Sequence, residues 1–192
     1  MDKVKEFFDN LAESWTNDND FKKVNNLLDL CDIRKGYQVL DIGCGKGVIT
    51  PLLQERTKVL VDAIDLSDNM INEAKKINSD KSKYNFIRGD FTEYDFDKLY
   101  DLAIIFNAYP HFLNVEKVVE KANSILKKNG KFIIMHDFKK EELNSHHKAH
   151  AMGVSRMLEK ADIEASKYSK YFNIVKTIDD DKCYLIILSK KN

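Results

Sequence analysis

The sequence predicts a single doubly wound α/β domain built on a mostly parallel sheet of seven strands. Five short apolar segments with strand character alternate with segments of helical periodicity, the pattern of a parallel sheet covered by helices on both faces. Two more strand-like segments follow each other directly near the end of the chain and predict an antiparallel hairpin. At 192 residues, 43% of them hydrophobic, the chain can bury one core, so we expect one domain over residues 1–192.

Two helices are expected ahead of the first strand, within residues 1–35. In the first helix, apolar side chains share one face: Phe7, Phe8, Leu11, Ala12 and Trp15. Residues 18–30 supply the second helix. Both belong to the part of the chain that precedes the glycine-rich segment described below.

The five strands of the parallel part are expected at 38–42, 59–64, 85–87, 102–106 and 131–135. A representative helix between them runs over 115–126, where apolar residues recur at helical spacing and Asn114 is placed to cap the first turn. The hairpin strands are expected at 171–178 and 183–188. These elements divide the domain into a core over 36–137, an intervening segment over 138–170 and a terminal hairpin over 171–192.

Charge and composition disfavour several classes of function. The chain has 31 Lys and Arg against 31 Asp and Glu, so it has no basic field that would attract nucleic acid. There is no secretory signal pattern and no apolar run of membrane-spanning length, so we expect a cytoplasmic protein without membrane contact. The three cysteines are widely spaced and form no Cys-x-x-Cys pair, so no structural metal is expected.

A glycine-rich turn follows the first strand. Residues 39–47 read VLDIGCGKG, a buried strand that carries Asp41 and opens into a turn containing Gly43, Gly45 and Gly47. Ligands of open α/β sheets bind beyond the carboxyl ends of the strands, and glycines there let a bulky cofactor approach the backbone. A dinucleotide fingerprint would need Gly or Ala where Val48 stands.

This turn resembles the first motif of the class I methyltransferases that use S-adenosylmethionine (SAM), which have a Rossmann-like fold. The resemblance implies that Asp41, Gly43, Cys44, Gly45 and Gly47 surround the methionine part of SAM.

Two later segments extend the resemblance. Asp65 ends the second strand and is followed by Leu66, Ser67 and Met70 in the pattern of the second methyltransferase motif. The resemblance implies that Asp65 accepts hydrogen bonds from the ribose hydroxyls, and that Leu66 and Met70 lie beside the adenine. After the third strand come Asp90 and Phe91. The resemblance implies that Asp90 accepts a hydrogen bond from the adenine amino group and that Phe91 packs on the ring.

The amino-terminal helices fit the same family. The pattern Phe8-Asp9-x-x-Ala12-x-x-Trp15 resembles the capping helix of many small-molecule methyltransferases, which closes over the cofactor and excludes water. The resemblance implies that residues 1–35 form this cap and that Trp15 contacts the cofactor.

The resemblance implies that the transferred methyl group lies where the fourth strand ends, so we expect Asn107 to contact the cofactor there and the methyl acceptor to bind beside it. Methyl transfer mainly requires alignment of the acceptor, and a base is needed only for a protonated acceptor. His111 and His136 follow the fourth and fifth strands and are the candidate bases, with Tyr109 as a third candidate catalytic residue. An Asn-Pro-Pro-Tyr motif is absent, which disfavours DNA adenine and protein glutamine as acceptors.

All five histidines fall between His111 and His150. His146 and His150 would share one face of a helix, where they could line a substrate pocket or bind a metal. No acidic or cysteine partner is fixed by the sequence, so we interpret residues 138–170 as a lid and substrate-selecting segment and expect no metal.

The sequence therefore predicts a methyltransferase that converts SAM to S-adenosylhomocysteine and methylates a small molecule. Three alternatives remain open: a non-catalytic or regulatory SAM-binding module, a methyltransferase acting on RNA or protein, and a nicotinamide-dependent oxidoreductase. The last would need a Tyr-x-x-x-Lys or an equivalent, which is not found. We expect a monomer or a homodimer, and the acceptor and the atom that is methylated are not specified.

Overall fold

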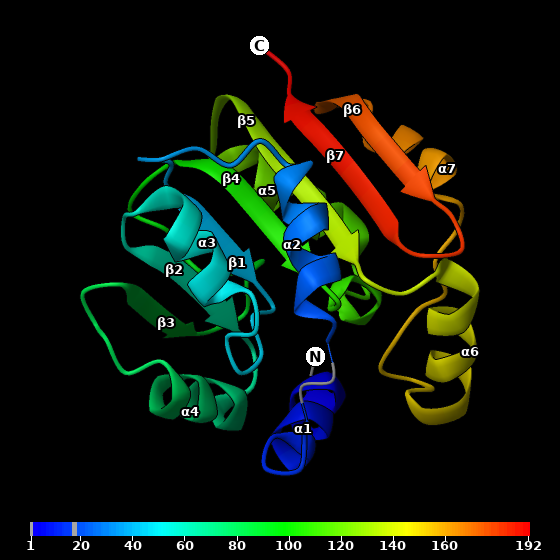
Figure 1. Cartoon of the computed structure of the whole chain (residues 1–192). Coiled ribbons are helices and arrows are strands. Elements are labelled where there is room, and N and C mark those ends of the chain that lie inside the picture. Colours follow the sequence, from blue (N-terminus) through cyan, green and yellow to red (C-terminus); the bar gives the residue numbers. More distant parts are fainter. Residues whose placement is uncertain (1, 17–18) are drawn as a thin grey trace.

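A computed structural model describes residues 2–16 and 19–192 of the chain (Figure 1). Its centre is a seven-stranded sheet in the order β3-β2-β1-β4-β5-β7-β6. The strands are β1 (Val39–Ile42), β2 (Val61–Asp65), β3 (Tyr84–Arg88), β4 (Tyr100–Phe106), β5 (Leu126–His136), β6 (Phe172–Asp179) and β7 (Tyr184–Lys190). The first five pair in parallel, and β7 pairs antiparallel with both β5 and β6. The predicted doubly wound sheet and its terminal hairpin are thus confirmed.

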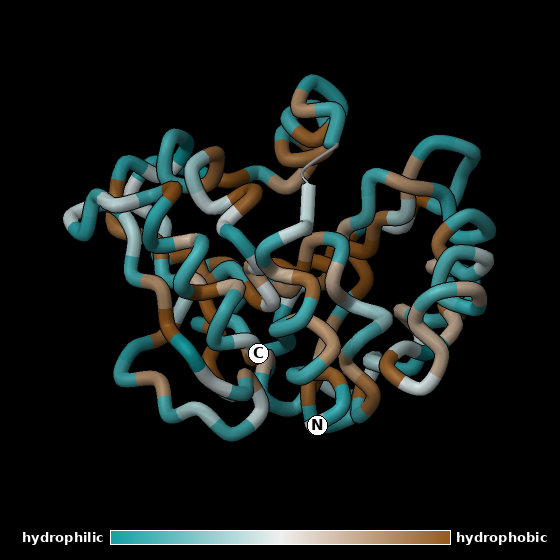
Figure 2. The backbone as a smooth tube through the Cα atoms, turned by 90° about the horizontal axis from the view of Figure 1, so that it is seen from below, coloured by the Kyte–Doolittle hydropathy of each residue, from teal (hydrophilic) through white to brown (hydrophobic). Residues whose placement is uncertain are grey.

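Helices cover both faces of this sheet. They are α1 (Asp2–Leu11), α2 (Phe21–Asp29), α3 (Thr50–Thr57), α4 (Asp68–Ile77), α5 (Val115–Ile125), α6 (Lys140–His150) and α7 (Ala161–Ser166), with a single 3-10 turn at Tyr109–His111. Buried side chains of α2 and α3 pack on one face of the sheet, and those of α5 and α7 pack on the other. Figure 2 looks from the side at which the parallel strands end and shows hydrophobic segments inside and hydrophilic segments outside.

The central strands are buried on both faces, as expected for a parallel sheet. Every residue of β1 is buried, and so are five consecutive residues of β4, from Leu102 to Phe106. Asn114 caps α5 as predicted, because its side chain accepts a hydrogen bond from the Lys117 backbone amide at 3.1 Å. The turn between β6 and β7 forms over residues 180–183, one residue later than the aspartate-rich turn predicted at 179–182.

Some element bounds differ from the prediction. The first helix ends at Leu11, so Ala12 and Trp15 follow it instead of extending its apolar face. The second helix begins at Phe21, because the Asp20 side chain accepts from the amides of the first turn, and the predicted start at residue 18 lies outside the described residues. β5 begins at Leu126, since a register shift opposite Tyr100 lets the strand extend backwards.

No helix in residues 2–16 and 19–192 combines the length and the apolar character needed to cross a bilayer.

Candidate active site

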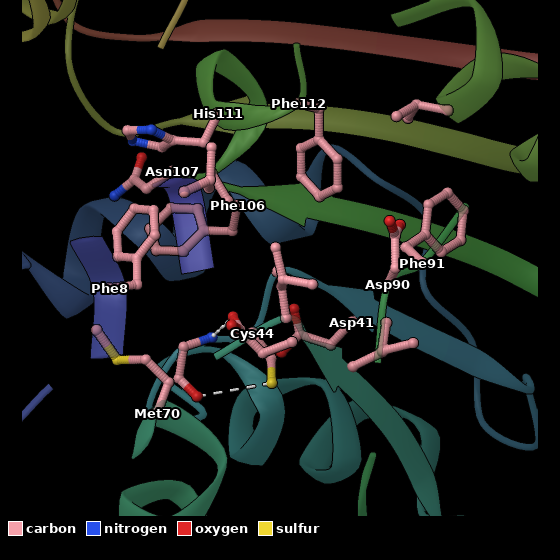
Figure 3. A pocket seen from close by; sticks show the side chains of 18 of the residues that line it. Phe8, Asp41, Cys44, Met70, Asp90, Phe91, Phe106, Asn107, His111 and Phe112 are labelled. Atoms are coloured by element: carbon pink, nitrogen blue, oxygen red, sulfur yellow. Dashed lines mark hydrogen bonds between the residues drawn. The ribbon is translucent and has the colours of Figure 1, made fainter. Parts of the chain in front are cut away.

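A cavity of about 380 Å³ opens beyond the carboxyl ends of β1, β2 and β4. This is where the strand order reverses direction, the usual ligand position in open α/β sheets. The cavity brings together all but one of the predicted cofactor residues: Trp15, Asp41, Gly43, Cys44, Gly45, Asp65, Leu66, Met70, Asp90, Phe91 and Asn107. The remaining predicted residue, Gly47, lies outside the lining. Figure 3 shows Asp90 and Phe91 at one end of the cavity and Phe8, Asn107 and His111 at the other.

The glycine turn needs glycine for two different steric reasons. Gly43 has a φ of +66°, and a Cβ atom there would lie 2.8 Å from the Cβ of Ala108, so glycine allows the segment after β4 to close over the turn. Gly47 has a φ of +77°, and a Cβ atom there would lie 3.0 Å from the ring of Phe86. Gly47 therefore lets the turn pack closely against Phe86, and it does not line the cavity.

Asp41 lies beneath the glycine turn and is almost fully buried, with 1% of its surface exposed. Burial raises the pKa of this carboxyl to about 7, and the nearby Asp65 charge adds to the effect. The Thr50 hydroxyl donates a 2.6 Å hydrogen bond to the carboxylate and opposes the shift. A cation bound beside Asp41 would restore its charged form at neutral pH.

Asp65 ends β2 at the edge of the cavity. The Gly45 amide donates to one carboxylate oxygen at 2.8 Å, and the Ser67 amide donates to the other at 2.9 Å. Burial raises the pKa of Asp65, while these two backbone hydrogen bonds oppose the rise. The carboxylate thus joins the glycine turn to the start of α4 and keeps acceptor capacity toward the cavity.

Asp90 offers an unused acceptor at the far end of the cavity. Its Oδ1 accepts from the Thr92 amide at 2.8 Å and from the Thr92 hydroxyl at 2.9 Å. Its Oδ2 is buried and has no hydrogen-bond partner among the described residues. Leaving a buried acceptor unpaired is costly, so this atom fits a hydrogen-bond donor of a ligand that lies against Phe91.

The opposite end of the cavity is organised by an Asn–Asp pair that the sequence analysis did not identify. Asn107, with a φ of +52°, donates through Nδ2 to Asp137 Oδ1 at 2.7 Å, and the Asp137 amide donates back to Asn107 Oδ1 at 3.2 Å. Asn19 donates to the second Asp137 oxygen at 2.9 Å. The signal was available, because Asp137 directly follows β5 just as Asn107 directly follows β4.

His111 lines the cavity in a defined tautomer. Its Nδ1 lies 2.9 Å from the carbonyl oxygen of Val154, and a carbonyl can only accept, so Nδ1 carries the proton. In the neutral ring, Nε2 is then an unprotonated acceptor, and no described residue forms a hydrogen bond with it. Burial lowers the pKa of His111, which favours this neutral form. The rings of Phe8 and His147 pack edge-on against the imidazole, with centroids 4.8 and 4.9 Å away.

Tyr109 and His136, two of the three predicted catalytic residues, lie outside this cavity. Tyr109 starts the 3-10 turn that His111 ends, and its hydroxyl donates to Glu164 at 3.0 Å in a buried cluster with Tyr168. His136 ends β5 and packs against Tyr184, its cross-strand partner in β7. Side chains alternate along a strand, so His136 points to the α7 face of the sheet. The next residue, Asp137, points the other way and contacts Asn19 and Asn107, which line the cavity.

The buried His136 gives the protein an acid-sensitive core. Burial lowers the pKa of His136 to about 3, with smaller contributions from His147, His111 and Arg156. In the unfolded chain His136 binds a proton below pH ~6.5, whereas in the folded protein it stays neutral. Protonation therefore favours the unfolded state, and the free energy of unfolding decreases as the pH falls below about 6.5. We expect the free energy of unfolding to drop by about 2 kcal/mol more in the wild type than in His136→Leu between pH 6.5 and pH 5.

Urea unfolding at the two pH values measures this difference. Asp41 has a raised pKa, so it adds stability as the pH falls and opposes the effect of His136. The change in free energy of unfolding between the two pH values must therefore be compared between the wild type and His136→Leu, in which Asp41 contributes equally. Equal pH dependence in both proteins would show that His136 does not titrate in this way.

The predicted histidine pair does share a face of α6. The rings of His146 and His150 lie 4.9 Å apart, and both side chains are exposed. Among the described residues, no group of three or more His, Cys, Asp or Glu side chains is placed to hold a metal ion.

The fold and the cavity together define an α/β protein with a candidate ligand site at the ends of its parallel strands. Residues 33–184 match the family model described as methyltransferase domain. The chain therefore belongs to this methyltransferase family, and its fold is that of the class I methyltransferases.

Curated relatives share part of the chain. A ubiquinone biosynthesis O-methyltransferase of Rickettsia conorii is 32% identical over 137 residues, which are 70% of this chain and 43% of that protein. A malonyl-[acyl-carrier protein] O-methyltransferase of Acetivibrio thermocellus is 32% identical over 112 residues, 57% of this chain and 39% of that protein. The chain spans less than half the length of these relatives.

Solved structures share the fold over nearly the whole chain. A chain from the complex between the Haloferax volcanii Trm112 methyltransferase activator and a methyltransferase matches with a TM-score of 0.83 at 17% identity, covering 98% of both chains. The N-methyltransferase NodS of Bradyrhizobium japonicum, solved with S-adenosyl-L-homocysteine, matches with a TM-score of 0.70 at 14% identity, covering 92% of this chain and 90% of that one.

Proposed function

We propose that this protein transfers the methyl group of SAM to a hydroxyl oxygen of a small-molecule acceptor and releases S-adenosylhomocysteine, with His111 as the general base. The observation that carries the proposal is the different chemistry at the two ends of this cavity. One end offers the unpartnered acceptor of Asp90, and the other end offers the unprotonated Nε2 of His111. The O-methyltransferase names of the relatives support an oxygen acceptor.

The residues present fit SAM. Asp90 Oδ2 would accept from the adenine amino group, with Phe91 beside the ring. Asp65 would accept from the ribose hydroxyls, and the glycine turn above Asp41 would hold the methionine part, whose amino group supplies the cation that Asp41 lacks. The volume of about 380 Å³ falls within the range of small-molecule sites.

When bound, SAM supplies an activated methyl group on a sulfonium centre. His111 accepts the acceptor's hydroxyl proton at Nε2 while Val154 holds the ring through Nδ1. The Asn107–Asp137 pair fixes the backbone beside the reacting atoms. Phe8 and Trp15 cover the cavity from the amino-terminal side and exclude water.

Calorimetric titration with SAM, S-adenosylhomocysteine, S-inosylhomocysteine and NAD tests the cofactor site. We expect stoichiometric binding of the two adenosyl ligands and no binding of NAD. S-Inosylhomocysteine lacks the amino group that Asp90 would accept from, so it should bind about tenfold more weakly. Binding of NAD alone would contradict the proposed site.

Release of S-adenosylhomocysteine in the presence of phenols and alcohols, amines, thiols, RNA and protein then tests the acceptor. Turnover is expected with hydroxylated small molecules. Turnover confined to any other set would overturn the proposed acceptor, and tight cofactor binding without turnover on any set would favour a binding module.

A further inference from the structure

The amino-terminal helix is attached to the start of α4 by one side chain. The carboxylate of Asp9 accepts from the Ser67 hydroxyl at 2.6 Å and from the Asn69 backbone amide at 3.0 Å, both through Oδ1. The Asn69 side chain in turn donates to the Asp9 carbonyl at 3.0 Å. Figure 1 shows α1 beside α4 below the ends of the parallel strands, and α4 is the element that α1 chiefly packs against.

The charge of Asp9 strengthens this attachment. Lys5 lies one turn earlier and bridges Asp9 at 2.5 Å and Asp68 at 2.8 Å, and Arg88 pairs with Asp68 at 2.9 Å. Burial works to raise the pKa of Asp9, but its hydrogen bonds with Lys5, Ser67 and Asn69 outweigh burial and lower the pKa to about 2. An anion also suits the amino-terminal end of a helix, where free backbone amides gather. Asp9 is therefore charged throughout the physiological range.

The attachment is directly linked to the cofactor site. Ser67, whose hydroxyl donates to Asp9, donates its backbone amide to Asp65, the carboxylate expected to hold the ribose. On the neighbouring face of the same helix, Val4 and Phe8 line the cavity, and the Phe8 ring packs edge-on against His111. One face of α1 thus contacts the start of α4 through Lys5 and Asp9. The neighbouring face lines the cavity with Val4 and Phe8.

The segment after the helix is attached separately. Lys46, inside the glycine turn, donates to the Trp15 carbonyl at 2.9 Å. Trp15 lines the cavity mouth and its ring centroid lies 6.3 Å from that of Phe8. We call α1 and the following residues up to Trp15 the cover of the cavity. Asp9 attaches the cover to Ser67, and Lys46 attaches it to the glycine turn, so it is held at two different predicted cofactor motifs.

We infer that Asp9 is a positioning residue that holds α1 closed over the cofactor and so sets the rate at which SAM and S-adenosylhomocysteine leave. This inference rests on the proposed cofactor site. It assigns to Asp9 a role in retention, not in chemistry, because Asp9 contacts α4 and not the cavity.

The test compares Asp9→Ala and Asp9→Asn with Asp80→Ala by stopped-flow and steady-state fluorescence. Trp15 is the only tryptophan of the chain and stands at the cavity mouth, so its emission reports on the cover. Asp80 is a matched control, since it also accepts from a serine hydroxyl and a backbone amide and pairs with a lysine, but it lies on an exposed loop away from the cavity.

We expect Asp9→Ala to raise the dissociation rate of S-adenosylhomocysteine about tenfold, with a smaller effect on the association rate, because the lost contacts hold the closed form. Asp9→Asn keeps an acceptor oxygen and should fall between Asp9→Ala and the wild type. In the ligand-free protein, Asp9→Ala should make Trp15 more accessible to acrylamide. Asp80→Ala should match the wild type in each measurement.

Wild-type dissociation and quenching in a folded Asp9→Ala protein would overturn the inference while leaving the cofactor site intact. A change in both rates without any change in quenching would also overturn it, because that result would mean damage to the Asp65 site and not opening of the cover. If the wild type binds no S-adenosylhomocysteine, the proposed function fails, and the quenching comparison still decides whether Asp9 holds the cover.

Discussion

Replacing Asp65 with Asn should abolish measurable SAM binding, with a loss of affinity of about a hundredfold or more. The carboxylate accepts from the Gly45 and Ser67 amides and is expected to accept from the ribose hydroxyls as well. An asparagine of the same size has one acceptor oxygen, and its NH₂ group would face a backbone N–H donor. Hydrogen bonds to a charged group contribute about 1.5–3 kcal/mol each, so losing two of them accounts for the expected effect.

Calorimetric titration with SAM and S-adenosylhomocysteine measures this loss. Asp101→Asn is the matched control, because Asp101 also accepts from a backbone amide, that of Gln38, but does so at the opposite end of the sheet. The control should bind as the wild type does. Retention of wild-type affinity by a folded Asp65→Asn protein would contradict the assignment of Asp65 to the cofactor.

Replacing His111 with Asn should lower kcat on a hydroxylated acceptor by about 10²- to 10⁴-fold, the usual contribution of a general base. The asparagine NH₂ group can take the place of Nδ1 and keep the hydrogen bond to the Val154 carbonyl, while the base at Nε2 is lost. The affinity for SAM should change little, because His111 lies at the end of the cavity away from Asp90 and Phe91, where we propose that the acceptor binds.

The pH dependence of kcat gives a second signature. Burial lowers the pKa of His111, so the neutral base should persist to lower pH than a free histidine would, and wild-type activity should fall only when the pH drops below about 6.5. His111→Asn should lose this acidic limb, whereas His146→Asn, on the exposed face of α6, should keep it. An unchanged acidic limb in His111→Asn would assign the base to another group.

The fold could be predicted because each element has its own local signal. Alternating strand and helix patterns specified the parallel sheet, and the aspartate-rich turn specified the hairpin of β6 and β7. Helix ends were less accessible, because a cap such as that of Asp20 depends on which of several nearby polar side chains reaches the amides. The backward extension of β5 depends on its neighbour β4, which no local pattern reveals.

The end of the cavity proposed for the cofactor was more predictable than the end proposed for the acceptor. The predicted cofactor residues lie in short motifs at the ends of strands, so strand order alone brings Asp41, Asp65 and Asp90 to one cavity. The acceptor side depends on the direction of single side chains. His136 ends a strand at the correct edge of the sheet, yet alternation turns it away, and the contact that fixes the tautomer of His111 comes from a distant carbonyl, that of Val154.

The order of the strands in the sheet also determines when the cavity can form during folding. The cavity lies where β1 meets β4, and these strands are separated in the sequence by β2, β3 and the helices between them. Pairing of Leu40 with Ala103 must therefore close a long loop, a step that costs more chain entropy than pairing of neighbours. Competence to bind SAM should accordingly be acquired late in folding, after β4 has docked, and a nascent chain that ends at β3 would have the glycine turn without a binding site.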